Sequence, residues 1–197
     1  MSDSTSTPAK VDGRRLRSDR SRQVIVEAML QLINEGNLVP TAQQIANHAK
    51  VGIRSVFRHF EDMEAIFATA DQIWREGFTG KSTTVDPGLP LAQRITWAVK
   101  EIQGHYEDNG NILKSTATRR WRSAFLKQNY AKHQSRMRTD ISNALPEIGS
   151  LPVSQQEAIF GIMSFEYWDR LRDHQSLSID DSRALITELL QTLIPST

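Results

Sequence analysis

The segment VGIRSVFRHF, residues 51–60, places two arginines, a serine and a histidine among large apolar residues. Arginine can form paired hydrogen bonds to guanine, serine can reach bases or phosphates, and isoleucine or phenylalanine can contact a thymine methyl. If Val56 and Phe60 face a core, six side chains remain wholly or partly outward: Ile53, Arg54, Ser55, Phe57, Arg58 and His59. This pattern suits a surface that enters a DNA groove, and it equally suits an ordinary amphipathic helix with a charged outer face.

The flanking residues predict the elements that would present this surface. TAQQ, residues 41–44, is a capping box that opens a short helix to about His48. A tight turn over residues 49–52 then leads to a second short helix, about Ile53 to Phe60. Two short helices joined by such a turn have the proportions of a helix-turn-helix, although a helical hairpin with a polar outer face has the same spacing. The inward positions are Ile45, Ala49, Val51, Val56 and Phe60.

Charge is distributed unevenly along the chain. The formal net charge is +1, yet residues 9–60 hold nine basic against four acidic side chains. Such an excess at one end is expected where that end meets a polyanion. A solvated basic segment would look the same. The basic run before and within the first helix comprises Arg14, Arg15, Arg17, Arg20 and Arg22.

The composition excludes several classes of protein. With no cysteine there is neither a disulfide framework nor a thiolate metal site, as is typical of a reducing cytoplasm, where we expect the protein to act. No apolar run approaches the roughly 20 residues of a membrane-spanning helix, and no secretory signal is expected. The histidines lack metal-ligand spacing, and there is no glycine-rich phosphate loop or nucleophile elbow. We therefore expect no enzyme, metal or cofactor.

The rest of the chain predicts an all-α fold of about nine helices. Residues 1–13 are small and polar and are expected to be disordered. An apolar stripe predicts a first helix from Ser18 to Glu35, ended by Gly36, and a fourth runs from Glu61 towards Phe78. Residues 80–90, rich in glycine and proline, indicate a boundary.

Beyond that boundary the helical pattern returns. We expect a helix from Leu91 to Tyr106, a break at Asn109–Asn111 and helical structure over much of residues 112–144. SQQE, residues 154–157, is a second capping box, expected to open a helix to about His174. The last helix is expected to run from Asp181 to Ile194.

The last two predicted helices are apolar over more than the roughly 100° that a surface helix needs. Such helices bury a second face, either deep in the core or against another subunit, and we favour the subunit interface. In a symmetric dimer the two pairs would form a four-helix bundle. The candidate interface residues are Ile159, Phe160, Met163, Tyr167, Leu185, Leu189 and Leu193.

Aromatic residues in the second half of the chain are candidates for a ligand pocket. Large aromatic side chains can line a cavity between helices, although at helical spacing they are more often core. The candidates are Trp97, His105, Tyr106, Trp121, Phe125, Phe165 and Trp168.

The stretch TAQQIANHAKVGIRSVFRHFEDMEAIF resembles the DNA-binding domain of the tetracycline-repressor (TetR) family of transcriptional regulators. The specific resemblance covers about 50 residues, from Ser18 to Phe67. YWDRLRDHQSLSID, residues 167–180, is similar to the segment before the family's last dimerisation helix. The residues in register with the family pattern are Thr41, Ile45, Ala46, Ala49, Val51, Ser55, Val56, His59, Phe60 and Ile66.

The resemblance implies a homodimeric regulator, most often a repressor, that a small-molecule effector releases from a palindromic operator. Residues 14–67 would form the DNA-binding domain, and residues 68–197 would bind the effector and dimerise. No membrane is implied. Base contacts would come from Ile53, Arg54, Ser55 and Arg58, with Gln43 and Phe57 also in reach. Phosphate contacts would come from Thr41, Gln44, Lys50, His59 and the arginines Arg14, Arg15 and Arg17.

Three positions depart from the family pattern. Lys50 stands where the family has a glycine, at a turn position that often takes a left-handed conformation. Phe57 replaces a tyrosine whose hydroxyl binds phosphate, and Met63 replaces a phosphate-binding lysine. Because phosphate contacts set affinity and register, these changes predict weaker or differently anchored binding. The alternative is therefore a TetR-like ligand-binding or protein-interaction module with weakened operator binding.

Overall fold

The computed structural model describes residues 13–76 and 85–195 and confirms the all-α fold. Those residues form nine α-helices and two shorter helical segments, without a strand. The chain divides into two compact units, Met1–Trp74 and Arg75–Thr197. We call the first unit the head. The segment expected to be disordered, residues 1–13, lies outside the described residues except for Gly13, which begins the first helix.

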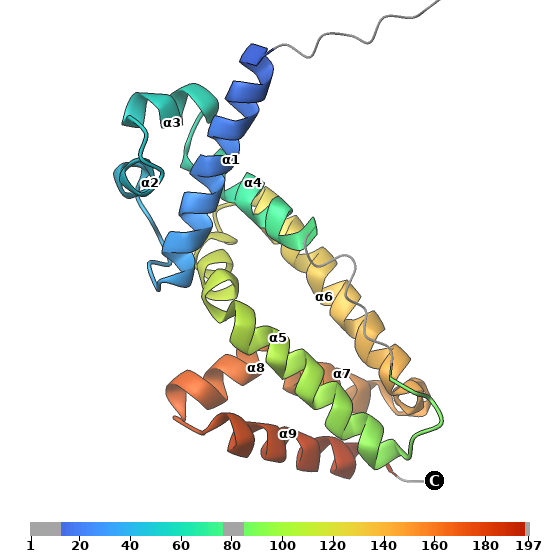
Figure 1. The fold of residues 1–197 in the computed structure, drawn as a ribbon. Helices are drawn as coiled ribbons and strands as arrows, with labels where there is room; N and C mark the ends of the chain where they lie inside the picture. Colours follow the sequence, from blue (N-terminus) through green and yellow to red (C-terminus); the bar gives the residue numbers. More distant parts are fainter. Residues whose placement is uncertain (1–12, 77–84, 196–197) are drawn as a thin grey trace, which may run out of the picture. The chain divides into compact units, whose positions relative to one another are not determined.

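The head contains α1 (Gly13–Asn34), α2 (Ala42–His48), α3 (Ile53–His59) and most of α4 (Met63–Glu76) (Figure 1). Helices α1, α2 and α3 pack against one another. Gly36 has a φ of +96°, so it ends α1 in the left-handed conformation expected of glycine there. The fully buried side chains of the core include Ile25, Met29, Ile45, Val56 and Ile66, and Phe60 is nearly fully buried.

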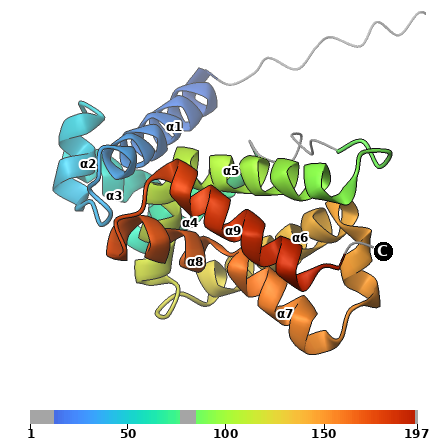
Figure 2. The same cartoon turned by 90° about the horizontal axis from the view of Figure 1, so that it is seen from below.

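The second unit is built around one long helix, α5 (Leu91–Arg119), which packs against α6, α8 and α9. Figure 2 shows α9 lying alongside α5. The remaining elements follow in chain order: α6 (Ala124–Ala144), a 3-10 turn (Pro146–Ser150), α7 (Val153–Ile162), α8 (Phe165–Asp169), a π-helical turn (Arg170–His174) and α9 (Ile179–Leu193).

Helix α5 runs without interruption through Asn109–Asn111, so the predicted break there is wrong. A glycine inside a helix costs about 1 kcal/mol relative to alanine, and packing readily offsets this. Ile112 and Leu113 are buried directly after Gly110. The side-chain amide of Asn109 donates a 2.9 Å hydrogen bond to the carbonyl of His105, one turn earlier, so this polar side chain has a partner within the helix.

The predicted capping box at Ser154 is also wrong. Helix α7 begins at Val153 after Pro152 and has no side-chain cap. The helix ends at Ile162, and Ser164 caps a separate helix by accepting a 3.3 Å hydrogen bond from the Tyr167 amide. Ser178 caps α9 in the same way, with the Asp181 amide at 3.0 Å.

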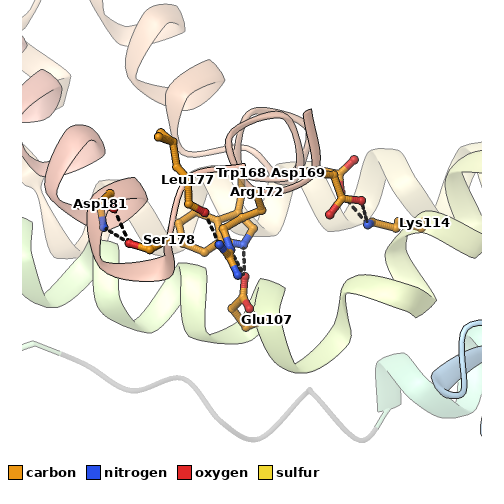
Figure 3. A network of polar contacts seen from close by, with 9 residues as sticks. Glu107, Lys114, Trp168, Asp169, Arg172, Leu177, Ser178 and Asp181 are labelled. Carbon is orange, nitrogen blue, oxygen red and sulfur yellow. Dashed lines mark hydrogen bonds and ion pairs between the residues drawn. The ribbon is translucent and has the colours of Figure 1, made fainter. Parts of the chain in front are cut away.

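A polar network joins α5 to α8 and the π-helical turn (Figure 3). The buried indole of Trp168 donates 2.8 Å to Oε1 of Glu107, and Arg172 Nε donates 3.1 Å to the same oxygen. Two turns along α5, Lys114 pairs with Asp169 at 3.0 Å and also with Asp173. Since a buried indole N–H needs a partner, Glu107 fixes the register of this segment on α5.

Within the described ranges, no helix is long and apolar enough to cross a membrane.

Candidate nucleic-acid interface

The first helix of the predicted motif begins at the capping box that the sequence indicated. The Gln44 amide donates 3.3 Å to Thr41 Oγ1, and the Thr41 amide donates 2.8 Å to Gln44 Oε1. Both residues are exposed. The box satisfies two of the backbone donors at the N-terminus of α2 that have no partner within the helix.

The turn between α2 and α3 is a Schellman motif with Lys50 in the left-handed position. Its φ is +54°. The Val51 amide donates 2.9 Å to the Ala46 carbonyl and the Lys50 amide 3.2 Å to the Asn47 carbonyl, which are the two bonds that define the motif. A non-glycine residue pays roughly 1–2 kcal/mol for this conformation. The departure at Lys50 therefore keeps the turn and adds an exposed ammonium group to it.

Helix α3 is anchored from below by two of the predicted inward residues. Val56 is fully buried and Phe60 nearly so, and Ile45 of α2 is buried beside them in the same core. Ala49 and Val51 are half-buried rather than buried, because they lie in the turn. The predicted inward residues therefore do face the core, and those within the helices are more deeply buried than the two in the turn.

The outer face of α3 carries the residues predicted for base contact. Arg54 and Arg58 are exposed, and Ile53 and Phe57 expose 39% and 49% of their surface. Arg58 Nη2 donates 3.2 Å to Ser55 Oγ, one turn earlier. Among the described residues, the side chains of Arg54 and Lys50 make no hydrogen bond or ion pair. Two guanidinium groups and two apolar side chains therefore share one solvent-facing surface.

His59 differs from its neighbours on α3. Its Nε2 is buried and has no hydrogen-bond partner among the described residues. Burial lowers the pKa of the imidazole below 6.5, and the charges of Arg58 and Arg22 lower it further, so the ring is neutral at pH 7. Only Nδ1 is left to meet a phosphate, and a neutral ring is a weak partner for one.

The basic residues of α1 differ in whether their side chains face solvent or are bonded within the head. Arg17 and Arg20 are exposed, whereas the side chains of Arg14 and Arg15 lie outside the described part of the structure. Arg22 is engaged within the head: Nη1 donates 3.1 Å to the His59 carbonyl and Nη2 3.1 Å to Thr69 Oγ1. The sequence offered no signal that separated Arg22 from the other arginines.

The other predicted contact positions surround α3. Gln43 is exposed on α2 and donates 2.8 Å to the side chain of Asn47. Met63 is half-buried at the start of α4, which Asp62 caps by accepting a 2.8 Å hydrogen bond from the Ala65 amide. No cation therefore stands at the position of the family's lysine.

The aromatic candidates for a ligand pocket are split by the structure. Tyr106 is buried, donates 2.9 Å to the Met163 carbonyl and meets the Phe165 ring edge-on at 5.5 Å. His105 lies 5.9 Å from the Tyr106 ring and 6.1 Å from the His133 ring. Burial raises the pKa of Tyr106 and lowers that of His105.

The remaining aromatic candidates lie in different surroundings. Trp168 is buried in the same region as Tyr106 and Phe165, and Trp97 is half-buried. Trp121 is 70% exposed and Phe125 39% exposed at the turn from α5 to α6. These two side chains therefore do not line the interior of the second unit.

The candidate interface residues also fall into two groups. Ile159 and Met163 are completely buried inside the unit, so within one chain they offer no surface to a partner. Phe160, Tyr167 and three leucines of α9 are half-buried. The α9 leucines form a second row beside the buried row of Ser182, Ile186 and Leu190; they are Leu185, Leu189 and Leu193.

No cluster of three histidine, cysteine, aspartate or glutamate side chains that could hold a metal ion is present in residues 13–76 and 85–195.

Comparisons with known proteins identify the fold. No family model and no curated protein matches the sequence. A transcriptional regulator from Rhodococcus sp. RHA1 has a similar structure, with a TM-score of 0.68 at 17% identity over 88% of this chain and 95% of that chain. A TetR transcriptional regulator from the same organism gives 0.51 at 19% identity over 90% of this chain and 96% of that chain. This chain therefore has the fold of these transcriptional regulators.

Proposed function

We propose that this protein is a TetR-family transcriptional regulator that binds DNA in a sequence-specific manner through the outer face of α3. One observation carries the proposal: two arginines and two apolar side chains, Arg54, Arg58, Ile53 and Phe57, lie exposed on a short helix whose opposite side is anchored in the core. A short helix with such side chains fits the major groove and can read guanine and thymine there. The fold shared with two transcriptional regulators supports the same function.

The regulator is proposed to act as a homodimeric repressor. Residues 14–67 form the DNA-binding domain, and residues 68–197 bind an effector and dimerise. The half-buried row of α9 leucines, with Phe160 and Tyr167, supplies the apolar surface for a partner copy. An effector in the second unit changes the spacing of the two heads and releases a palindromic operator. His105, Tyr106, Phe165 and Trp168 are the candidates to contact the effector. The protein is proposed to act in the cytoplasm and to have no enzymatic activity.

A second candidate is a TetR-like ligand-binding or protein-interaction module that binds operators weakly. It is favoured by Phe57 and Met63, which carry no hydroxyl or ammonium group for phosphate. Against it stand Lys50, Arg54 and Arg58, whose cationic side chains are all exposed.

Selection of genomic DNA fragments with the purified protein, followed by titration of the recovered site at several salt concentrations, separates the two candidates. If the protein is a regulator, we expect a palindromic site bound with a Kd of roughly 10 nM or tighter at physiological salt. We also expect a steep loss of affinity as the salt concentration rises. Fragments without a common sequence, bound only weakly, would favour the second candidate. Light scattering tests the dimer, and a monomer at micromolar concentration would contradict the two-headed mechanism.

A further inference from the structure

Arg22 of α1 links three helices of the head at one point. Its Nη1 donates 3.1 Å to the carbonyl of His59, the last residue of α3, and its Nη2 donates 3.1 Å to Oγ1 of Thr69 on α4. The guanidinium carbon lies 4.3 Å from the centre of the Phe60 ring, directly after α3. One planar group thus contacts the end of α3, its first following residue and α4 together.

The location of these contacts matters because α3 is only seven residues long. A helix of that length has no stability of its own and depends on tertiary contacts. Its last carbonyls lack partners within the helix, and a cation is favourable at this end of the helix dipole. Phe60, buried and in extended conformation, terminates the helix directly beside the guanidinium. Arg22 therefore acts as a cap on α3 that is supplied from another helix.

We propose that Arg22 is a positioning residue for DNA recognition. It fixes the C-terminal end of α3 against α1 and α4 and so sets the direction in which Arg54 and Arg58 face the groove. Both terminal nitrogens of Arg22 are already bonded within the head, so its role differs from that of a phosphate-binding arginine. This inference rests on the proposed function of α3.

Two substitutions separate a positioning role from phosphate contact in the full-length protein. Arg22→Lys keeps the charge but cannot bond both acceptors in one plane, and Arg22→Met removes the charge and keeps an apolar stem. Positioning predicts that both variants bind the operator at least about tenfold more weakly, with an unchanged slope of log affinity against log salt. Near-normal affinity of Arg22→Lys, with a slope reduced by about 0.9 per subunit in Arg22→Met, would mean phosphate contact and overturn the proposal.

Hydrogen exchange of the free protein tests the same role without DNA. In Arg22→Lys the amides of Val56 and Phe60, at the middle and end of α3, should exchange faster, while those of Ile45 and Ala49 around α2 stay as protected as in the unmodified protein. Faster exchange at all four amides would mean a general loss of stability. Unchanged exchange would mean that Arg22 does not stabilise the end of α3. Either result overturns the proposal. If no operator is found, the exchange result still decides whether Arg22 stabilises the end of α3.

Thr69→Val provides a milder test, because it removes one acceptor of Arg22 and keeps the shape of the side chain. It should produce the same pattern of exchange and a smaller loss of operator affinity. Thr96→Val in α5 is the matched control, since Thr96 makes the same hydrogen bond to the carbonyl four residues earlier, as Thr69 does. Equal behaviour of Thr69→Val and Thr96→Val would contradict a role for the bond between Arg22 and Thr69.

Discussion

The ion-paired cations of the second unit and the cations on and beside α3 lie in different surroundings. In the second unit, Arg94 pairs with Glu147, Lys114 with Asp169 and Asp173, and Arg138 with Glu157. On α3 and in the turn before it, the side chains of Arg54 and Lys50 have no hydrogen-bond or ion-pair partner among the described residues. A buried paired charge stabilises its own unit, whereas an exposed unpaired one on a fixed element is available to a polyanion. The comparison indicates that Arg94 acts within its own unit, whereas Arg54 and Lys50 are available to a partner outside the head.

The largest expected effect comes from breaking the least exposed ion pair of the second unit. The side chain of Arg94 is 9% exposed and also donates to the carbonyls of Leu89 and Ala144. Arg94→Met leaves Glu147 and both carbonyls without this partner and should lower the free energy of unfolding by roughly 3 kcal/mol, the low end for a buried pair because Glu147 is 29% exposed. Urea denaturation measures the loss.

The matched control for that prediction is Arg138→Met, which breaks an exposed pair and should leave stability close to that of the unmodified protein. Equal losses in the two variants would contradict the distinction between buried and exposed pairs. Neither variant should change which base pairs the protein prefers.

Removing a cation from the head should weaken DNA binding and leave stability almost unchanged. Arg54→Ala should weaken operator binding by roughly 1–3 kcal/mol, the value of a good paired contact to a base. Stability should change by less than about 0.5 kcal/mol, because Arg54 is exposed and unpaired. Fluorescence anisotropy and urea denaturation measure the two quantities. Arg122→Ala, which removes an exposed arginine from the second unit, is the control and should alter neither.

The substitution Lys50→Gly tests the role of the second exposed cation of the head. Lys50→Gly relieves a residue whose φ is +54° and should stabilise the head by about 1 kcal/mol. The same change removes one charge and should reduce the salt slope by about 0.9 per subunit if Lys50 binds phosphate. Ala49→Gly is the control: Ala49 has a φ of −71°, so glycine there should destabilise. A Lys50→Gly protein less stable than the original would contradict the assignment of strain.

The smallest expected effects concern the two histidines whose pKa values are lowered. Because burial holds the pKa of folded His59 below 6.5, the unfolded chain takes up the proton first, and stability should fall as pH drops below about 6.5 towards the folded pKa. His59→Gln should flatten this dependence for the head. His105→Gln should do the same for the second unit, where burial lowers the pKa and Asp108 opposes the shift. Unfolding free energies between pH 5 and 7 provide the measurement.

Local signals made much of the head predictable. Three local signals act through neighbours a few residues away: the capping pair Thr41 and Gln44, the helix-ending Gly36 and the apolar stripes at helical spacing. The elements of the head and the exposed face of α3 therefore followed from the sequence. The left-handed Lys50 followed from the family resemblance. Arg22 did not, because its partners His59 and Thr69 lie 37 and 47 residues away along the chain.

The second unit was harder to predict for the same reason. Residues 109–111 look like a helix break, and only packing by Ile112 and Leu113 shows that α5 continues. SQQE at residues 154–157 has the pattern of a capping box, yet α7 begins one residue earlier without a side-chain cap, and the serine that caps in this region is Ser164, at α8. Trp121 and Trp168 cannot be told apart by spacing, yet one is exposed and the other buried.

The central claim is that Arg54 on the outer face of α3 reads a base. The most direct measurement is the affinity of the unmodified protein and of Arg54→Ala for an operator and for each of its single-base-pair variants. One base pair in each half-site should cost the unmodified protein roughly 1–3 kcal/mol when changed and cost the variant almost nothing, while penalties elsewhere stay equal. Identical penalties at every position in both proteins would contradict the claim.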